Sequence, residues 1–131
     1  MSKSYDGVLW AWPTQGQIIK GFSASSEGKK GINIAGREGQ RVLAAASGKI
    51  VYAGSGLGGY GQLIIVEHNK KYLSAYAHNS VLKAKEGDRV TIGQPIAAMG
   101  KTGTSRVMLH FEIRRDGKAV DPVRYLPAQN P

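Results

Sequence analysis

Apolar residues recur along this chain in short runs that are separated by turns rich in glycine. Each run covers about 3–7 residues, and several runs alternate apolar with polar residues or are β-branched, as strands do. No stretch keeps the period of an amphipathic helix for more than about two turns, and a single helical turn is expected at 79–82 or 122–125. We therefore predict an all-β fold, a folded antiparallel sheet with open edges and a groove. The predicted strands cover residues 31–35, 42–46, 49–53, 62–67, 72–77, 89–91, 95–99 and 109–114.

Three turn signals separate these runs. Ser47-Gly48 lies between two apolar runs and predicts a hairpin turn. Residues 54–61, GSGLGGYG, predict a flexible loop whose backbone can approach another group closely. Asp116-Gly117 follows a strand near the end of the chain and is typical of a type I′ hairpin.

The length of 131 residues fits one globular domain and leaves no room for a second. The polar first residues predict a flexible lead-in over 1–11, followed by the domain at 12–127 and a tail at 128–131. We expect Trp10 and Trp12 to pack over the open end of the sheet. No apolar run approaches the roughly 18 residues that a membrane span needs.

Composition narrows the possible chemistry. The chain has no cysteine and three histidines, so it cannot form disulfides, use a cysteine nucleophile or ligate zinc through thiolates. Eighteen Lys and Arg residues exceed nine Asp and Glu residues, which gives a net charge of +9. The basic residues are scattered and are not interleaved with aromatic residues, which argues against a dedicated nucleic-acid protein. We interpret them as a solvated basic surface, with non-specific attraction of polyanions as the alternative.

Three short segments carry the candidate chemistry: KKGIN at 29–33, YAH at 76–78 and MLHFE at 108–112. Together with GQPI at 93–96 and the loop GKTGTS at 100–105, they resemble the LytM/lysostaphin-type zinc metallopeptidase domain. The resemblance runs through nearly the whole chain, and its motifs follow in the family's order and spacing. It implies the all-β fold of that family, with a groove over the sheet.

The family's zinc site combines a His-x-Gly-x-Asp motif, a Tyr-x-His motif and a His-x-His-Phe motif. The resemblance puts the first ligand position at Lys29, the aspartate ligand position at Asn33 and the last ligand position at His110. It puts the two histidines that assist the chemistry at His78 and Met108. Of these five positions, this chain keeps the family's residue only at His78 and His110.

The replaced residues do not suit a catalytic zinc ion, which needs about three protein ligands and an open position for water. A protonated lysine offers no lone pair, so Lys29 cannot coordinate the ion, and Asn33 offers only a neutral carbonyl oxygen. Met108 cannot transfer protons. Moving the alignment to Lys30 supplies no histidine, and His68 could enter only if the fold differed. We therefore predict no zinc, no other cofactor and no peptidase activity.

Members of this family with degenerate zinc sites resemble the NlpD/EnvC class of envelope proteins. That resemblance implies activation of periplasmic N-acetylmuramoyl-L-alanine amidases, which cleave peptidoglycan when daughter cells separate. It also implies the periplasm or cell envelope as the location, with a parent protein of the outer-membrane lipoprotein type. Two alternatives stay open: an envelope domain that binds peptidoglycan or polyanions, and an active zinc metalloendopeptidase with an unorthodox site.

In the activator hypothesis the empty groove binds the amidase. Met108, Tyr60 and Tyr76 would be apolar anchors, and Lys29 and Asn33 would be polar contacts. Strand alternation puts Met108 on the same face as His110. The alternatives are that Met108 fills the core and that the histidines are buried and hydrogen-bonded. The predicted groove residues are Lys29, Asn33, Tyr60, Tyr76, His78, Arg106, Met108 and His110.

Overall fold

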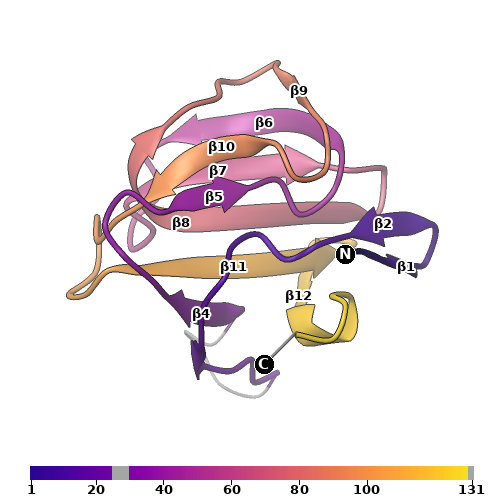
Figure 1. Ribbon diagram of the computed structural model, residues 1–131. Coiled ribbons are helices and arrows are strands. Elements are labelled where there is room, and N and C mark those ends of the chain that lie inside the picture. The colour runs from indigo at the N-terminus through magenta and orange to yellow at the C-terminus, as the bar shows by residue number, and fades with distance from the viewer. Residues whose placement is uncertain (25–29, 130–131) are drawn as a thin grey trace.

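Antiparallel strands make up almost all of the regular structure (Figure 1), in a computed structural model that describes residues 1–24 and 30–129. Among these residues one short 3-10 helix, η1 (Pro122–Arg124), accompanies the strands. The prediction of an all-β fold is confirmed. The strands are β1 (Lys3–Tyr5), β2 (Val8–Trp10), β3 (Ile18–Lys20), β4 (Ile32–Ala35), β5 (Arg41–Leu43), β6 (Gly48–Gly54), β7 (Gln62–Glu67), β8 (Tyr72–Leu82), β9 (Arg89–Val90), β10 (Pro95–Met99), β11 (Met108–Arg115) and β12 (Lys118–Val120).

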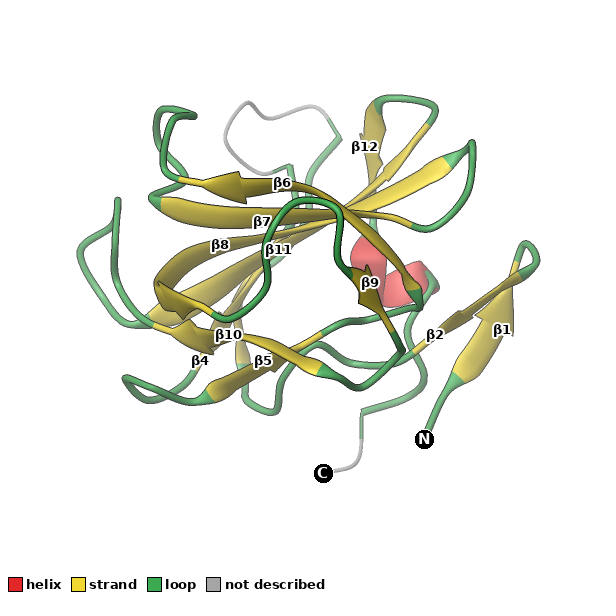
Figure 2. Cartoon of the chain, turned by 90° about the horizontal axis from the view of Figure 1, so that it is seen from above, coloured by secondary structure: helices red, strands yellow, loops and turns green. Residues whose placement is uncertain are grey.

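The main sheet has the order β3-β4-β11-β8-β7-β6-β9, and it folds over itself through the long strand β8. Up to Ala77, β8 pairs with β11 on one side, and from Asn79 onward that side pairs with β10, which in turn pairs with β5. On its other side β8 pairs with β7 as far as Asn79. His78 has a φ of 70° at this change of partner. The β5–β10 pair consequently lies opposite β6 and β7 (Figure 2).

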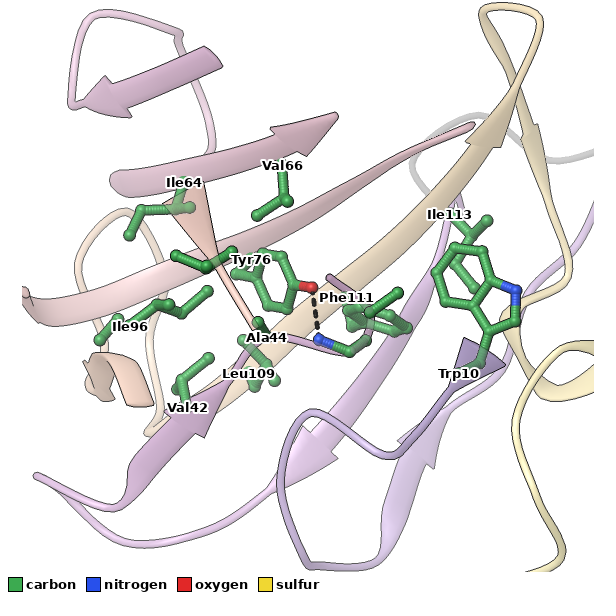
Figure 3. Close-up of a cluster of buried hydrophobic side chains, with 14 of the residues drawn as sticks. Trp10, Val42, Ala44, Ile64, Val66, Tyr76, Ile96, Leu109, Phe111 and Ile113 are labelled. Carbon is green, nitrogen blue, oxygen red and sulfur yellow. Dashed lines mark hydrogen bonds between the residues drawn. The ribbon is translucent and has the colours of Figure 1, made fainter. Parts of the chain in front are cut away.

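The core fills the space between the folded layers, as the close-up in Figure 3 shows. Along β11, Leu109, Phe111 and Ile113 point into this core and are fully buried. The hydroxyl of Tyr76 lies among them and accepts a hydrogen bond of 2.9 Å from the backbone N–H of Ala45. The strand's other face is thereby left for polar side chains, because neighbouring residues of a strand point to opposite faces.

Residues 3–10 form a hairpin, so the prediction of a flexible lead-in over 1–11 is wrong there. Asp6 and Gly7 both have positive φ, 50° and 80°, as a type I′ turn requires. Trp10 is fully buried and packs edge-on against Tyr72 and Tyr125. The carboxylate of Asp6 accepts a hydrogen bond of 2.7 Å from the Tyr72 hydroxyl, which ties the turn to β8.

The turn predictions had mixed outcomes. Asp116 and Gly117, with φ of 51° and 81°, join β11 to β12 in a hairpin, which confirms that prediction. Ser47-Gly48 is not a hairpin turn, because β5 pairs with β10 whereas β6 pairs with β7 and β9. The buried alanines just before Ser47 let the chain cross between the layers there. The helical turn forms at η1, and residues 79–82 belong to β8.

Candidate functional site

The candidate site lies on the open face of the sheet, where β4, β8 and β11 run side by side. His110, Glu112 and Arg114 alternate along β11 with the buried Leu109, Phe111 and Ile113, so their side chains point away from the core. In register with His110 are Asn33 on β4 and Ala77 on β8. This register brings together side chains from residues 33, 77 and 110, which are far apart in the sequence.

A chain of hydrogen bonds joins the polar side chains of this face. His110 Nδ1 lies 2.6 Å from Asn33 Oδ1, and His110 Nε2 lies 2.7 Å from Glu112 Oε2. Arg114 donates to Glu112 Oε1 through both Nε and Nη2, at 2.8 and 2.7 Å. The Tyr60 hydroxyl donates to Glu112 Oε2 at 3.0 Å. We call these five residues, Asn33, Tyr60, His110, Glu112 and Arg114, the site network.

The Glu112 carboxylate is the centre of the site network, and its side chain is only 1% exposed. Burial by itself raises the pKa of this carboxyl, but the hydrogen bonds and charges of His110 and Arg114 outweigh burial and hold the pKa below its ordinary value. Burial and the Glu112 charge together raise the pKa of Tyr60. The site therefore holds an ionised carboxylate between two basic side chains and a neutral phenol.

His78 stands beside the site network. Its Nδ1–H donates to the Thr102 carbonyl at 2.7 Å, and its backbone N–H donates to the Tyr60 carbonyl at 2.9 Å. Its ring centre lies 6.1 Å from that of His110. Burial lowers the pKa of His78, and the nearby His110 lowers it further against the opposing effect of the Thr102 hydrogen bond. The two retained histidines are thus neighbours, each held in place by a partner on another segment.

The other predicted groove residues are distributed differently. Met108 is the first residue of β11, on the same face as His110, and it is buried, with an exposure of 8%. Arg106 is exposed on the turn before β11. Tyr76 is wrong as a groove anchor, because it is fully buried on the core side of β8 and bonds there to Ser74 and Ala45. Lys29 lies outside the described residues.

Sequence reasoning missed Glu112 and Arg114, which hold the site network together. The signal was present, because both residues continue the same period-2 face that starts at Met108 and His110. The alternation places Glu112 on the outer face of β11 as an ordinary polar residue, yet its side chain is only 1% exposed, and its two basic neighbours on that face explain how the buried charge is tolerated.

With this geometry established, comparison with known proteins identifies the family. The profile of peptidase family M23 matches residues 27–122, and the chain belongs to this family. Among solved structures, it is similar to a zinc-containing peptidase of Vibrio cholerae, with a TM-score of 0.82 and 26% identity over 98% of this chain and 46% of that one. It is also similar to lysostaphin of Staphylococcus simulans, with a TM-score of 0.77 and 30% identity over 84% of this chain and 48% of that one.

Comparison with curated sequences shows which members of this family the chain resembles in sequence. The chain is 59% identical over 118 residues to the lipoprotein NlpD/LppB homologue of Pseudomonas aeruginosa, covering 90% of this chain and 40% of that protein. It is 58% identical over 118 residues to the murein hydrolase activator NlpD of Escherichia coli, covering 90% of this chain and 31% of that protein. The chain thus spans less than half the length of these relatives. No helix among residues 1–24 and 30–129 is long and apolar enough to cross a membrane.

The described donor set does not fit the zinc ion that the peptidases of this family imply. Residues 1–24 and 30–129 contain no group of three His, Cys, Asp or Glu side chains arranged to hold a metal. Asn33 offers only a neutral amide oxygen, and both ring nitrogens of His110 already face oxygen atoms of Asn33 and Glu112. Glu112 in turn is neutralised by Arg114. A zinc ion would have to break this paired network to gain its ligands.

Proposed function

We propose that this chain is a non-catalytic activator of N-acetylmuramoyl-L-alanine amidases, acting in the bacterial periplasm or envelope without a metal of its own. One observation carries the proposal. His110, the retained family ligand position, is tied on both ring nitrogens into a network with Asn33 and Glu112. The polar side chains of such a site bind one another without an ion, and the open face of the sheet remains accessible to a protein partner.

The loss of catalytic groups supports the non-catalytic part of the proposal. Zinc hydrolases use the ion to lower the pKa of a bound water to about 7, and no described side chain can replace the ion in that step. Met108 stands where the family has a histidine that assists the chemistry, and a thioether neither accepts nor delivers a proton. Lys29 carries an ammonium group that would repel a divalent cation.

The similarity to NlpD proteins supports the activator role and the envelope location. One relative is named a murein hydrolase activator, and others are named lipoproteins, including an outer membrane antigenic lipoprotein of Haemophilus influenzae. The amidase as the activated hydrolase is our proposal for this chain. We also propose as contact residues Asn33, Tyr60, His78, Met108, His110, Arg106 and Lys29.

An activator of this kind works by binding one state of its partner better than another. It can open a closed amidase only by the difference between its affinities for the two forms. Converting a population from 1:99 to 99:1 needs roughly 5.5 kcal/mol of such preference. A few buried anchors in a groove can supply a difference of this size, because buried apolar and aromatic contacts contribute most of an interface's free energy.

The test is dye release from labelled sacculi. The purified chain is mixed with each of several N-acetylmuramoyl-L-alanine amidases from Pseudomonas aeruginosa and Escherichia coli, and each component is also assayed alone. We expect the chain to stimulate at least one amidase and to release no dye by itself. Chelator-sensitive release by the chain alone would show a peptidase, and absence of stimulation with every amidase would contradict the activator role.

The net charge of +9 favours a second candidate, a domain that binds peptidoglycan or another polyanion. This candidate predicts co-sedimentation with sacculi but no stimulation of amidases. Electrostatic attraction of scattered surface charges weakens steeply with salt. Sedimentation that persists at high salt, without stimulation, would therefore favour specific peptidoglycan binding over the activator.

A further inference from the structure

A hollow beside the site network has one charged wall and one apolar wall. Its floor is the outward face of β8 at Ala75, which presents only a methyl group. On one side, Ala75 is in register with Glu112 of β11, and on the other side with Ile65 of β7. Small residues between larger neighbours leave a depression, and the hollow measured there has a volume of about 210 Å³. We call it the β8 hollow.

The apolar wall belongs to a small hydrophobic cluster separate from the main core. Leu63, Ala75 and Ala77 form its buried part, and Tyr60 and Ile65 pack against them. Leu57, on the glycine-rich loop 54–61, lines the same hollow and is 44% exposed. An exposed leucine over a preformed apolar floor gains free energy when another apolar side chain covers it.

The charged wall ends at Arg114, which is in register with Leu73 at the outer end of the hollow. Its Nε and one Nη nitrogen bind Glu112 on a single oxygen, so part of the five-donor guanidinium fork is not used by this pair. The Arg114 side chain is 30% exposed. The Glu112 carboxylate is only 1% exposed, so the guanidinium is the charge of this wall that an approaching group meets.

We propose that the β8 hollow receives a segment of the amidase partner in which an acidic side chain stands close to a large apolar one; this inference rests on the proposed function. The carboxylate would bind the Arg114 donors that neither Glu112 nor Tyr60 engages, and the apolar side chain would lie over Ala75 beneath Leu57. The net charge of +9 also favours a partner segment that contains acidic residues.

The strand geometry fixes the spacing that such a segment needs. Leu73 and Ala75 are two residues apart on β8, so the positions above them are about 6–7 Å apart. Residues at i and i+2 of an extended segment have this separation, and those at i and i+3 or i+4 of a helix are nearly as far apart. An acidic and an apolar residue at one of these spacings would reach both walls together.

The test measures binding of chain variants to the amidase that the wild-type chain stimulates, immobilised on a sensor surface, over a series of salt concentrations. Leu57→Glu and Leu57→Lys both remove the apolar contact, but they place opposite charges over the hollow. We expect both to bind at least about tenfold more weakly than wild type, because burial of one leucine is worth about 1.5–3 kcal/mol. We expect the Glu variant to be weaker than the Lys variant, with a difference that shrinks as salt rises.

Two further variants complete the design. Ala75→Leu fills the floor and should reduce binding at least as strongly as Leu57→Lys. Val123→Glu is the matched control, since Val123 is 45% exposed but lies on η1 rather than at the hollow, and it should bind like wild type. Circular dichroism and thermal unfolding of each variant check that the chain is folded.

The outcomes separate this inference from the function on which it rests. If wild type stimulates and binds an amidase while the Leu57 and Ala75 variants bind equally well, the β8 hollow is not the contact and only this inference fails. Equal weakening by Leu57→Glu and Leu57→Lys at all salt concentrations would overturn the acidic segment. If the Leu57 and Ala75 variants lose binding to isolated muropeptides while their amidase binding is unchanged, the hollow binds muropeptides instead. If they lose a dimer that the wild-type chain forms, again with unchanged amidase binding, the hollow is an interface between two copies of the chain. If wild type binds and stimulates no amidase, both proposals fail.

Discussion

The Nδ1 atom of His110 lies 2.6 Å from the Oδ1 atom of Asn33 across the β4–β11 pairing. In the peptidases of this family the resemblance assigns these two positions to zinc ligands, which would be held near one another by the ion between them. Here the two side chains bond directly. The backbone of the family is thus kept while the polar contacts within the site are made by the protein itself.

Replacing Glu112 by glutamine should destabilise the fold. The substitution removes the buried anion that both His110 and Arg114 contact and leaves these two basic side chains without it. Because Arg114 is partly exposed, we expect a loss below the ~3–5 kcal/mol that breaking a fully buried pair costs, about 1–3 kcal/mol. Urea unfolding of Glu112→Gln measures it, with Glu67→Gln on the exposed side of β7 as the control. Equal stabilities for the two variants would show that Glu112 is not a central support of the site.

The half-buried His68 predicts a dependence of stability on pH. His68 Nδ1–H donates to the Ser47 carbonyl, and its Nε2 lies 2.7 Å from the Ser74 hydroxyl. Burial, against the opposing Ser47 hydrogen bond, lowers the pKa of His68 to about 4. The unfolded chain, with a histidine pKa near 6.5, therefore binds a proton between pH 6.5 and 4 that the folded chain does not. The free energy of unfolding should fall as the pH drops through this range, by up to about 3 kcal/mol.

The measurement is urea unfolding of wild type and His68→Gln at several pH values from 7 to 4. His78 and the carboxylates contribute their own pH dependence to both proteins, so the difference between the two curves isolates His68. We expect the wild type to lose more stability than the variant between pH 6.5 and 4. Parallel curves would contradict the assignment of a neutral, hydrogen-bonded His68.

The backbone of His78 makes a third prediction. Its φ of 70° lies in the left-handed region, which β-branched residues strongly disfavour and asparagine tolerates. His78→Val should therefore be less stable than His78→Asn by about 1–2 kcal/mol, although neither variant keeps the imidazole. Thermal and urea unfolding of the pair measure this difference. If the two variants were equally stable, the turn of β8 at this residue would need another explanation.

Much of the fold was predictable because β11 alternates cleanly. Leu109, Phe111 and Ile113 face the core and the residues between them face outward, as the period-2 pattern requires. β8 could not be interpreted in this way, because both of its faces are apolar. The face of β8 that points into the core contains the polar Ser74 beside Tyr76, whereas the outward face contains the apolar Ala75, so polarity does not distinguish the two faces. The error at Tyr76 follows from that ambiguity.

Two other features depended on contacts that a sequence pattern does not contain. The N-terminal hairpin looks polar and short, and its order comes from distant partners, among them Tyr72 and Tyr125 around Trp10. Glu112 looks like a surface charge until the strand register shows that His110 and Arg114 lie on the same face. In both cases tertiary contacts decided what local composition left open.

Restoring the family's residues should restore an affinity for zinc. We expect the triple variant Lys29→His, Asn33→Asp and Met108→His to bind zinc more tightly than the wild type, since an imidazole and a carboxylate replace an ammonium and an amide. Metal analysis after dialysis measures the bound ion. Asn33→Asp alone is the control and should gain less. Equal zinc contents in the triple variant and the wild type would show that positions 29, 33 and 108 are not what keeps zinc out.

Calorimetric titration of zinc into the wild-type chain, after treatment with chelator and dialysis, tests the central claim most directly. The account predicts no saturable binding at micromolar concentrations, because His110 is held by Asn33 and Glu112 and no trio of suitable ligands surrounds it in the described residues. Binding of one zinc ion per chain with nanomolar affinity, abolished by His110→Ala, would contradict it.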